Sequence, residues 1–358
     1  MIVAGAVAQR PRPGHAWVFL QWLLGLRRLG CDVAFVDRLP GDAAWLGRAM
    51  DRFGVPHALL DEGGRAVAGL SDDELRGRVR GSTLLNVTGY LRDERLLDLA
   101  ARRVYVDLDP GFPQMWRELG LADVLAGHDR FVTVGRNVGR SRCGVPTCGL
   151  DWIGTAPPVV LEEWPVAGRG SRFTTIASWR GAFAPVEYRG GMFGLRVHEF
   201  RKFAELPRLA GGDFELALDI DPAETRDLEL LRSNGWLVVD PARVAPDLDG
   251  YRAYVRGSAA ELMVAKSMYV QTRSGWFSDR SACYLAAGKP VLAQDTGLRD
   301  HYPTGEGLVV FSTLDEAVAG VETIRADYAR HSRAARELAE AAFHSDRVLG
   351  SLLEELER

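Results

Sequence analysis

Short apolar runs alternate with helix-like segments along the whole chain, and this alternation limits the chain to very few folds. The chain opens with an apolar run at 2–8 (IVAGAVA), an apolar-rich helix at 17–30 and a second apolar run at 32–37 (DVAFVD). Runs that are apolar throughout, instead of at every second residue, are typical of strands buried on both faces of a parallel sheet. These three segments therefore predict a right-handed βαβ unit.

The pattern continues in two series, which are separated by an irregular segment at 137–172 that is rich in glycine and proline. The first series has further strands predicted at 82–89, 103–109 and 130–135, with helices near 93–101 and 113–120. The second has strands predicted at 173–179, 214–220, 235–240, 290–295, 308–311 and within 261–272, with helices near 198–206, 224–233, 247–256, 278–288 and 313–357.

A chain of 358 residues has room for about two domains at roughly 150 residues each. We therefore predict the α/β class, with two Rossmann-like doubly wound domains at 1–168 and 169–335. Ligands of such sheets bind outside the carboxyl ends of the strands. The predicted site is accordingly a cleft that the two domains face.

Composition excludes several classes of protein. The 47% of hydrophobic residues exclude wholesale disorder, and the net charge of −4 argues against a nucleic-acid partner. No window approaches the ~18–20 apolar residues of a membrane span, and the first residues lack the basic start of a signal peptide, so we expect a cytoplasmic protein. Reduced thiols are expected, although a disulfide or half a metal site at Cys143 and Cys148 stays open.

The segment 273–297 (RSGWFSDRSACYLAAGKPVLAQDTG) carries the strongest functional pattern. Ser278 is a suitable N-cap and Asp279 follows it in the first turn. The helix opens directly after Gly275, Trp276 and Phe277, where free N–H groups and the helix dipole favour a diphosphate. The alternative is a capped helix that simply packs on the sheet.

Other side chains around this helix could complete a donor site. Arg280 or Arg273 would add a charge-assisted contact to phosphate. Gln294, Asp295 and Thr296 follow the next predicted strand, where an amide and a carboxylate could bind sugar hydroxyls. An ordinary turn at Asp295 is the alternative.

The segment resembles the C-terminal signature of GT-B glycosyltransferases, families 1 and 4 in particular, with a glycine/serine loop, a helix of small residues and Ala-x-Gly-x-Pro-Val. Residues 13–16 (PGHA) and 29–36 resemble the first βαβ unit of the same proteins. The resemblance implies that 273–297 binds a nucleotide diphosphate and its sugar, and that the last helix, 336–358, crosses back to the N-terminal domain. The two glutamates seven residues apart of many retaining members are absent, so the stereochemical outcome stays open.

His15 is the candidate catalytic base, because imidazole can take a proton from a hydroxyl near neutral pH. In inverting GT-B enzymes, a histidine at a similar place has this role. Asp109 or Asp107 of VDLDPG would orient it. The alternative is that His15 packs or caps at the helix start. Asp107 and Asp109 also resemble a metal-binding Asp-x-Asp, but the two-domain pattern favours a site without a metal.

The remaining candidates follow other predicted strands or lie near them. Arg180 and Gly181, next to Trp179, would approach phosphate, and Val244 lies in a loop (239–247) that contacts the base in the related fold. Trp17, Asp107 and His128 are candidate acceptor contacts, with packing as the alternative for His128. Arg196, Glu199 and Lys202 are interpreted as a solvated helix face.

The sequence thus predicts a glycosyltransferase that moves a sugar from a nucleotide-diphosphate donor to a hydroxyl of a small molecule, such as a natural product. The reaction would be a direct displacement assisted by His15, and the donor would be a co-substrate in an enzyme with no cofactor. A monomer and a homodimer are both compatible with the sequence. The alternatives are a nucleotide-sugar 2-epimerase of the same fold and a non-catalytic nucleotide-sugar binding protein.

Overall fold

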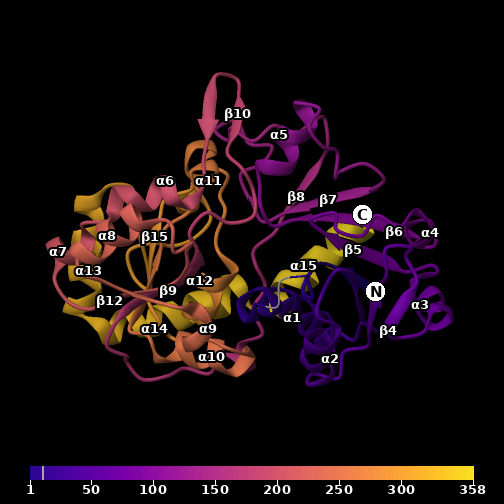
Figure 1. Ribbon diagram of the computed structural model, residues 1–358, viewed down its shortest axis with the longest axis horizontal. Helices are drawn as coiled ribbons and strands as arrows, with labels where there is room; N and C mark the ends of the chain where they lie inside the picture. Colours follow the sequence, from indigo (N-terminus) through magenta and orange to yellow (C-terminus); the bar gives the residue numbers. More distant parts are fainter. Residues whose placement is uncertain (10–11) are drawn as a thin grey trace. The chain divides into compact units, whose positions relative to one another are not determined.

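The computed structural model describes residues 1–9 and 12–358 and divides into two compact units. The first unit contains residues 1–139, 145–160 and 345–358, and the second contains 140–144 and 161–344. Each unit is built on one sheet, parallel throughout in the second unit and antiparallel only between β3 and β4 in the first. This arrangement confirms the predicted pair of Rossmann-like α/β domains (Figure 1).

The sheet of the first unit has the strand order β4-β3-β2-β1-β5-β6-β7-β8. Its strands are β1 Ile2–Ala4, β2 Ala34–Arg38, β3 His57–Leu60, β4 Ala66–Gly69, β5 Thr83–Val87, β6 Arg102–Asp107, β7 Arg130–Thr133 and β8 Trp152–Gly154. Its helices are α1 Pro13–Arg28, α2 Ala43–Asp51, α3 Asp72–Val79, α4 Glu94–Leu97, α5 Phe112–Glu118 and α15 Ser345–Glu357.

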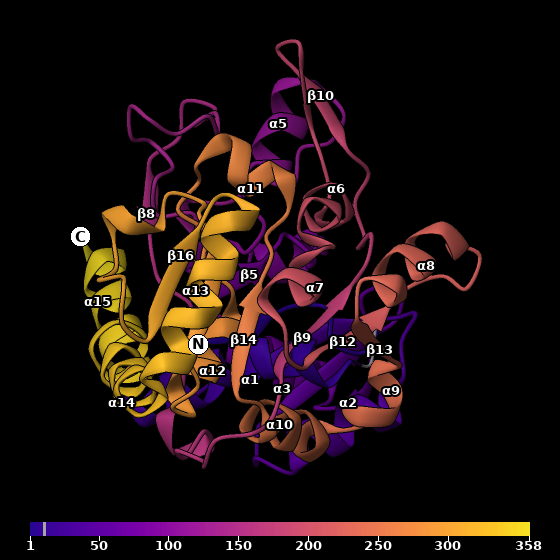
Figure 2. The ribbon, with the colours of Figure 1, turned by 90° about the vertical axis from the view of Figure 1, so that its left-hand side faces the viewer.

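The second sheet has the order β13-β12-β9-β14-β15-β16, and Figure 2 shows α13 in front of it. The strands are β9 Phe173–Ser178, β12 Phe214–Asp219, β13 Trp236–Val239, β14 Ala260–Met263, β15 Val291–Gln294 and β16 Leu308–Phe311, with a hairpin of β10 Val186–Tyr188 and β11 Gly191–Phe193. The helices are α6 Arg196–Phe200, α7 Leu206–Ala210, α8 Thr225–Ser233, α9 Pro241–Val244, α10 Leu248–Gly257, α11 Ser267–Thr272, α12 Asp279–Ala286, α13 Leu314–Ala326 and α14 Tyr328–Leu338. Single turns complete the unit: 3₁₀ turns η1 Leu161–Glu163, η2 Arg201–Phe203 and η3 Leu298–Asp300, and the π-helical turn η4 Ala339–Phe343.

Several elements differ from the sequence prediction. The first helix begins at Pro13 instead of residue 17, because a proline at the first helical position lacks only an N–H that would have no helical partner. The predicted irregular segment contains β8, and α2, α3, β3 and β4 lie in a stretch for which the sequence pattern predicted no element. The segment 261–272 holds one strand followed by α11.

Strand order determines where ligands can bind in each unit. In the first sheet, β1 lies between β2 and β5, with Val3 opposite both Phe35 and Leu85. In the second sheet, β9 lies between β12 and β14. In each sheet, the connections leave in opposite directions from these positions, and such sheets bind ligands in the crevice that this opens. The crevice of the first sheet is bordered by the loops after β1 and β5, and that of the second sheet by the loops after β9 and β14.

The last helix, α15, belongs to the first unit and packs on α1 (Figure 1). A Cβ built on Gly25 of α1 would lie 2.6 Å from Cδ1 of Leu349, so only glycine allows this approach. Arg28 donates twice to the Asp346 carboxylate, at 2.7 and 2.9 Å. The segment that joins the first unit starts at Ser345 rather than residue 336, because α14 and η4 still pack on the second unit, where Arg336 binds the carbonyl of Ala286.

Asp107, a predicted acceptor contact, is instead fully buried at the end of β6. Its carboxylate accepts hydrogen bonds from Gln114 Nε2 at 2.8 Å, Thr133 Oγ1 at 2.9 Å and the Asp109 N–H at 3.0 Å. Gln114 in turn accepts from the Gly111 N–H at 2.7 Å. The network joins the loop after β6 to α5 and β7, so the role of Asp107 is to shape this loop.

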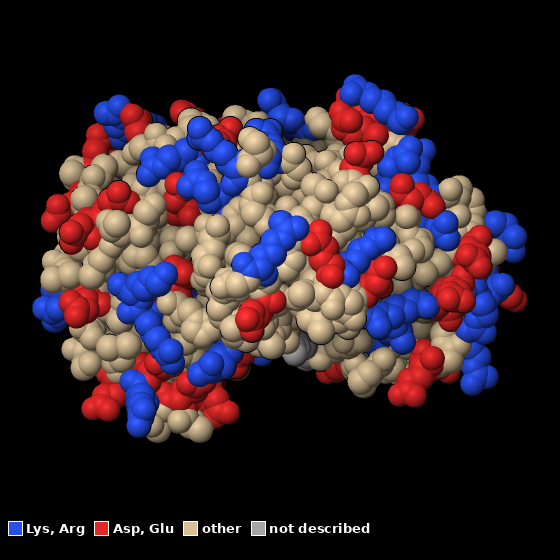
Figure 3. Space-filling view, turned by 90° about the horizontal axis from the view of Figure 1, so that it is seen from above, with Lys and Arg blue, Asp and Glu red and all other residues tan. Residues whose placement is uncertain are grey.

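The surface is mixed in charge. Figure 3 shows Lys and Arg interspersed with Asp and Glu on the face that it displays, in agreement with the small net charge. Among the residues that the structure describes, no helix combines the length and the apolar character that crossing a bilayer requires.

We predict that Asp107→Asn changes how stability depends on pH. Burial raises the pKa of Asp107 to about 7 from 3.8. Between these values the folded state keeps a proton that the unfolded state releases, so the carboxyl lowers stability as pH rises, by up to about 1.4 kcal/mol per pH unit. In urea unfolding at pH 5 and 7.5, the free energy of unfolding of the variant should therefore rise relative to that of the wild type at the higher pH. An equal difference at both pH values, as expected for the exposed control Asp73→Asn, would contradict this.

We also predict that Leu349→Ala lowers the free energy of unfolding by about 2–5 kcal/mol. The Leu349 side chain is fully buried against α1, so its removal leaves a cavity. Chemical denaturation measures the change, and Glu354→Ala on the exposed side of α15 is the matched control. A loss no larger than that of the control would show that α15 contributes little to the unit.

Candidate functional site

Two loops of the second unit meet at the carboxyl end of β15. The Gly275 N–H donates to the Thr296 carbonyl at 2.7 Å, and Thr296 Oγ1 donates to the Trp276 carbonyl at 2.6 Å. Gly275 has φ +73°, a conformation that glycine adopts without strain. The segment before α12 is thereby held beside the loop after β15, as the motif at 273–297 requires.

The N-terminus of α12 is surrounded by serine hydroxyls. Ser278 is the N-cap and is buried, and within the described chain its side chain makes no cap hydrogen bond. The Ser274 and Ser281 hydroxyls are fully buried, and neither finds a hydrogen-bond partner among the described residues. A buried hydroxyl without a partner costs free energy. Helix N–H groups and donor hydroxyls together form an environment suited to an anion.

The predicted contact of Arg280 with a phosphate differs from the contacts that its guanidinium makes in the structure. Its guanidinium pairs with the fully buried Glu261 of β14 and donates to the Ile176 carbonyl of β9 at 3.0 Å. A buried carboxylate requires a paired charge. The first turn of α12 thus directs Arg280 onto the sheet, where it neutralises Glu261.

Lys266 is a cation that the sequence reasoning missed. It is the N-cap of α11, directly after β14, and its ammonium lies 5.4 Å from the ring of Tyr269 and 5.1 Å from that of Phe183. Tyr269 packs against Trp276, with ring centroids 4.4 Å apart. Lys266 therefore lies close to the loop before α12. One of only three lysines, placed just after a strand, was the available signal.

Trp276 and Phe277 are buried and hold this loop in place. Phe277 stacks on Phe343 of η4 with ring centroids 4.9 Å apart, and the same Phe343 stacks on Tyr302. Both rings therefore fix the backbone ahead of Ser278, and their role in donor binding stays a prediction. Asp279, in the first turn of α12, is half-buried.

Gln294 and Asp295 bind their own unit. Gln294 donates to Glu199 at 2.7 Å and accepts from the Ala265 N–H at 3.1 Å. Asp295 accepts from the N–H groups of Gly297 and Leu298 at 2.8 and 3.1 Å. These two side chains shape the loops after β14 and β15, and their contact with a sugar stays a prediction. Thr296 is fully buried and bonds the segment before α12 through Gly275 and Trp276.

Glu199 also differs from the expected solvated helix face. It is 2% exposed, and it accepts from Lys202 Nζ at 2.8 Å as well as from Gln294. Arg196 donates to the Val264 carbonyl at 3.1 Å. Glu199 lies four residues before the buried Phe203, which puts both on one helical face. That spacing was the signal for its burial.

The loop after β9 holds three predicted donor residues. Trp179 is buried in the core and donates to Asp227 at 2.7 Å, and the half-exposed Arg180 forms a two-point ion pair with Glu224, which lowers the pKa of that carboxyl. Gly181 has φ +84°, and a Cβ built on it would meet no atom within 4 Å, so the backbone is open at this position. Val244 ends α9 and is half-buried.

In the first unit, His15 lies in the first turn of α1 rather than in a loop. Its Nε2 lies 2.8 Å from the Ala6 carbonyl, and its ring contacts Phe19 edge-on at 5.2 Å. Because a carbonyl only accepts, Nε2 carries the proton and Nδ1 is the basic nitrogen of the neutral ring. Asp109 is half-buried in the loop that Asp107 shapes.

The two other predicted acceptor contacts pack inside the first unit. Trp17 is 1% exposed and lies edge-on to Phe53. His128 accepts from Asn86 at 3.0 Å through Nε2 and donates to the Leu125 carbonyl at 3.1 Å through Nδ1, and burial lowers its pKa. Both side chains therefore pack within the first unit, and their contact with an acceptor stays a prediction.

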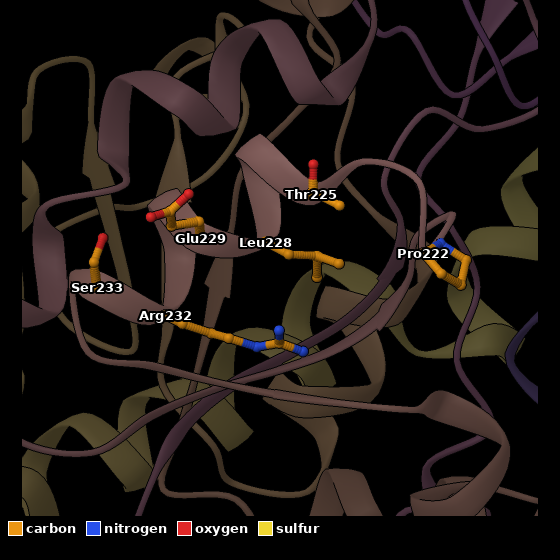
Figure 4. A pocket seen from close by; sticks show the side chains of 6 residues that line it. All are labelled: Pro222, Thr225, Leu228, Glu229, Arg232 and Ser233. Carbon is orange, nitrogen blue, oxygen red and sulfur yellow. The ribbon is translucent and has the colours of Figure 1, made fainter.

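Metal and cysteine chemistry add little to the site. In the described part of the chain, no group of three or more His, Cys, Asp or Glu could hold a metal ion. Cys143 and Cys148 are reduced thiols, and the Sγ of Cys148 lies 3.2 Å from the Gln114 carbonyl. A surface pocket of about 550 Å³ lies along α8, and none of the predicted site residues lines it (Figure 4).

Comparisons with known proteins agree on the architecture. No protein-family model and no curated protein sequence matches the chain. Among solved structures, HepE from Anabaena in complex with UDP-glucose matches with a TM-score of 0.64 at 11% identity, over 99% of this chain and 98% of that one. Sucrose-phosphate synthase from Thermosynechococcus elongatus matches with 0.60 at 14% identity, over 99% and 98%.

A third solved structure is AviGT4, a glycosyltransferase involved in avilamycin A biosynthesis. It matches with a TM-score of 0.53 at 14% identity, over 100% of this chain and 96% of that one. All three similarities extend over the whole chain, and all are similarities of fold at low identity. The chain therefore has the GT-B fold of nucleotide-sugar glycosyltransferases.

Proposed function

We propose that this protein is a glycosyltransferase that moves a sugar from a nucleotide-diphosphate donor to a hydroxyl of a small molecule. The observation that carries the proposal is the N-terminus of α12, where the buried hydroxyls of Ser274 and Ser281 have no partner in the described chain. A ligand with several acceptor oxygens would satisfy them. Related folds bind such ligands, since HepE was solved with UDP and with UDP-glucose.

On the donor side, the diphosphate would bind the N–H groups that open α12, with Ser278 at the N-cap. Lys266 would supply the positive charge for the diphosphate, because Arg280 is paired with Glu261. Gly181 would allow the donor to approach the backbone after β9, and Val244, the last residue of α9, would contact the nucleobase. These donors would also stabilise the charge that develops on the leaving diphosphate, without a metal.

On the acceptor side, His15 is the proposed base. The imidazole of His15 would take the proton of the acceptor hydroxyl while that oxygen attacks the anomeric carbon and the nucleotide diphosphate leaves, which inverts the anomeric centre. Asp109 lies in a loop of the same sheet and is proposed to bind the acceptor. A small-molecule acceptor agrees with the fold shared with AviGT4, an enzyme of natural-product biosynthesis.

We predict that UDP stabilises the protein and that Ser274→Ala weakens this effect. At 100 times its dissociation constant UDP adds about 2.7 kcal/mol, and loss of one hydroxyl contact lowers affinity about five- to tenfold. Without UDP the variant should unfold like the wild type or later, because it loses an unsatisfied buried group. Thermal shift with a panel of nucleoside diphosphates measures both effects.

The control for this experiment is Ser233→Ala, at the exposed end of α8. It removes the same hydroxyl far from α12 along the chain and should leave UDP binding unchanged. Equal UDP affinity in Ser274→Ala and the wild type would contradict the proposed donor site.

We predict that His15→Ala lowers turnover about 10²-fold or more and leaves UDP stabilisation intact, because the base is lost but the donor site is not. UDP release from UDP-sugars with an acceptor panel measures turnover, and His57→Ala on β3 is the control. Near-normal turnover would remove His15 from the mechanism. An epimer formed from donor alone would indicate a 2-epimerase, and UDP binding with no turnover on any acceptor would indicate a binding protein.

A further inference from the structure

The loop after β1 is held by a buried carboxylate at the end of β2. Both Val7 and Ala8 donate their backbone N–H to Asp37 Oδ2, each at 2.6 Å, and the Arg38 N–H donates to Oδ1 at 2.6 Å. Asp37 is 1% exposed. Three donors converge on one carboxylate, so this part of the loop has a single position relative to β2.

The same loop binds His15 through the carbonyl oxygen of the Ala6–Val7 peptide group. The Ala6 carbonyl accepts from His15 Nε2 at 2.8 Å, and the N–H of that same Ala6–Val7 peptide bond donates to Asp37. Because the peptide group is planar and conjugated, an acceptor on its N–H polarises its carbonyl. Asp37 and His15 are therefore joined through a single peptide bond.

Further contacts restrict the backbone of Gly5 and Ala8 in this loop. The Asp42 N–H donates to the Ala8 carbonyl at 3.0 Å, and a Cβ on Gly41 would lie 2.7 Å from Cβ of Ala8. On the other side, a Cβ on Gly5 would lie 2.0 Å from the Phe19 ring, which itself contacts His15. Residues Gly5 to Ala8 are therefore confined between the residues after β2 and helix α1.

We propose that Asp37 is a positioning residue that orients His15 and raises its basicity through the Ala6–Val7 peptide group. The carboxylate strengthens the Ala6 carbonyl as an acceptor, which stabilises the Nε2–H form and the protonated imidazole. Among the described residues, the charged groups nearest to this contact along the packed elements are Arg12 at the N-cap of α1 and Arg38 and Asp42 after Asp37, whereas Arg27 and Arg28 lie in the last turn of α1. This inference rests on the proposed function only for its effect on turnover.

The test replaces the charge and keeps the shape. Asp37→Asn retains an oxygen that can accept from Val7 and Ala8, whereas Asp42→Asn makes the same change five residues later, at the N-cap of α2, where the side chain accepts from the Trp45 N–H. NMR titration of the His15 ring needs no substrate. We expect the His15 pKa to fall by at least about 0.5 unit in Asp37→Asn and to stay unchanged in Asp42→Asn.

Turnover gives the second readout. Asp37→Asn should lower kcat about tenfold, with the KM for the donor unchanged, and should shift the acid limb of the kcat–pH profile to lower pH. In a His15→Ala background, the same change should lower kcat less than about twofold, because an effect that acts through His15 is already lost. If Asp37 had a purely structural role, Asp37→Asn would lower kcat by the same factor in the wild-type and His15→Ala backgrounds. The acid limb of the kcat–pH profile would then stay at the same pH.

The outcomes separate the two proposals. An unchanged His15 pKa in a folded Asp37→Asn variant overturns the inference whatever the activity. Normal turnover in His15→Ala overturns the proposed base and leaves the pKa result standing. If Asp37→Asn does not fold, Gly41→Ala, which displaces Ala8, should lower the His15 pKa instead. Loss of folding in both variants would show that the contact serves the fold and not His15.

Discussion

Buried carboxylates bind and shape the loops at the carboxyl ends of the strands, and the candidate site depends on this interaction. Asp37 binds the loop after β1, and Asp107 binds the loop after β6. In the second unit, Glu199 binds Gln294, which in turn binds the loop after β14. Each carboxylate is nearly inaccessible to solvent, so its hydrogen bonds to N–H groups are strong and leaving them unmade would be costly.

This constraint also explains how the arginines are used. Three of those near the second sheet neutralise acidic partners: Arg280 pairs with Glu261, Arg180 with Glu224 and Arg201 with Asp227. Arginine suits these pairs because its planar fork binds a carboxylate at two points. At the N-terminus of α12, where we propose the donor site, the described groups suited to an anion are backbone N–H groups, serine hydroxyls and the nearby Lys266.

Much of the fold could be predicted from the sequence, because buried parallel strands and their glycine and proline boundaries leave a local pattern. The motif at 273–297 likewise predicted the α12 N-terminus, since N-caps and glycine turns are local features. The partners of the polar side chains could not be predicted. Whether Arg280 faces a ligand or Glu261 depends on a strand 19 residues away, and the half-buried environment of His15 depends on Ala6 and Phe19.

The sequence by itself determined two α/β halves, their strand and helix order and the helix opening at Ser278, because periodicity and capping act over a few residues. Only the tertiary structure decided the partners within each unit of Trp17, Asp107, Trp179, Arg280 and Gln294. It also decided that the Ser274 hydroxyl is buried without a partner in the described chain and that Asp37 binds the loop after β1. The physical reason is that a polar side chain takes its role from the partners that burial imposes on it. Those partners come from strands that are neighbours in the sheet and distant in the chain.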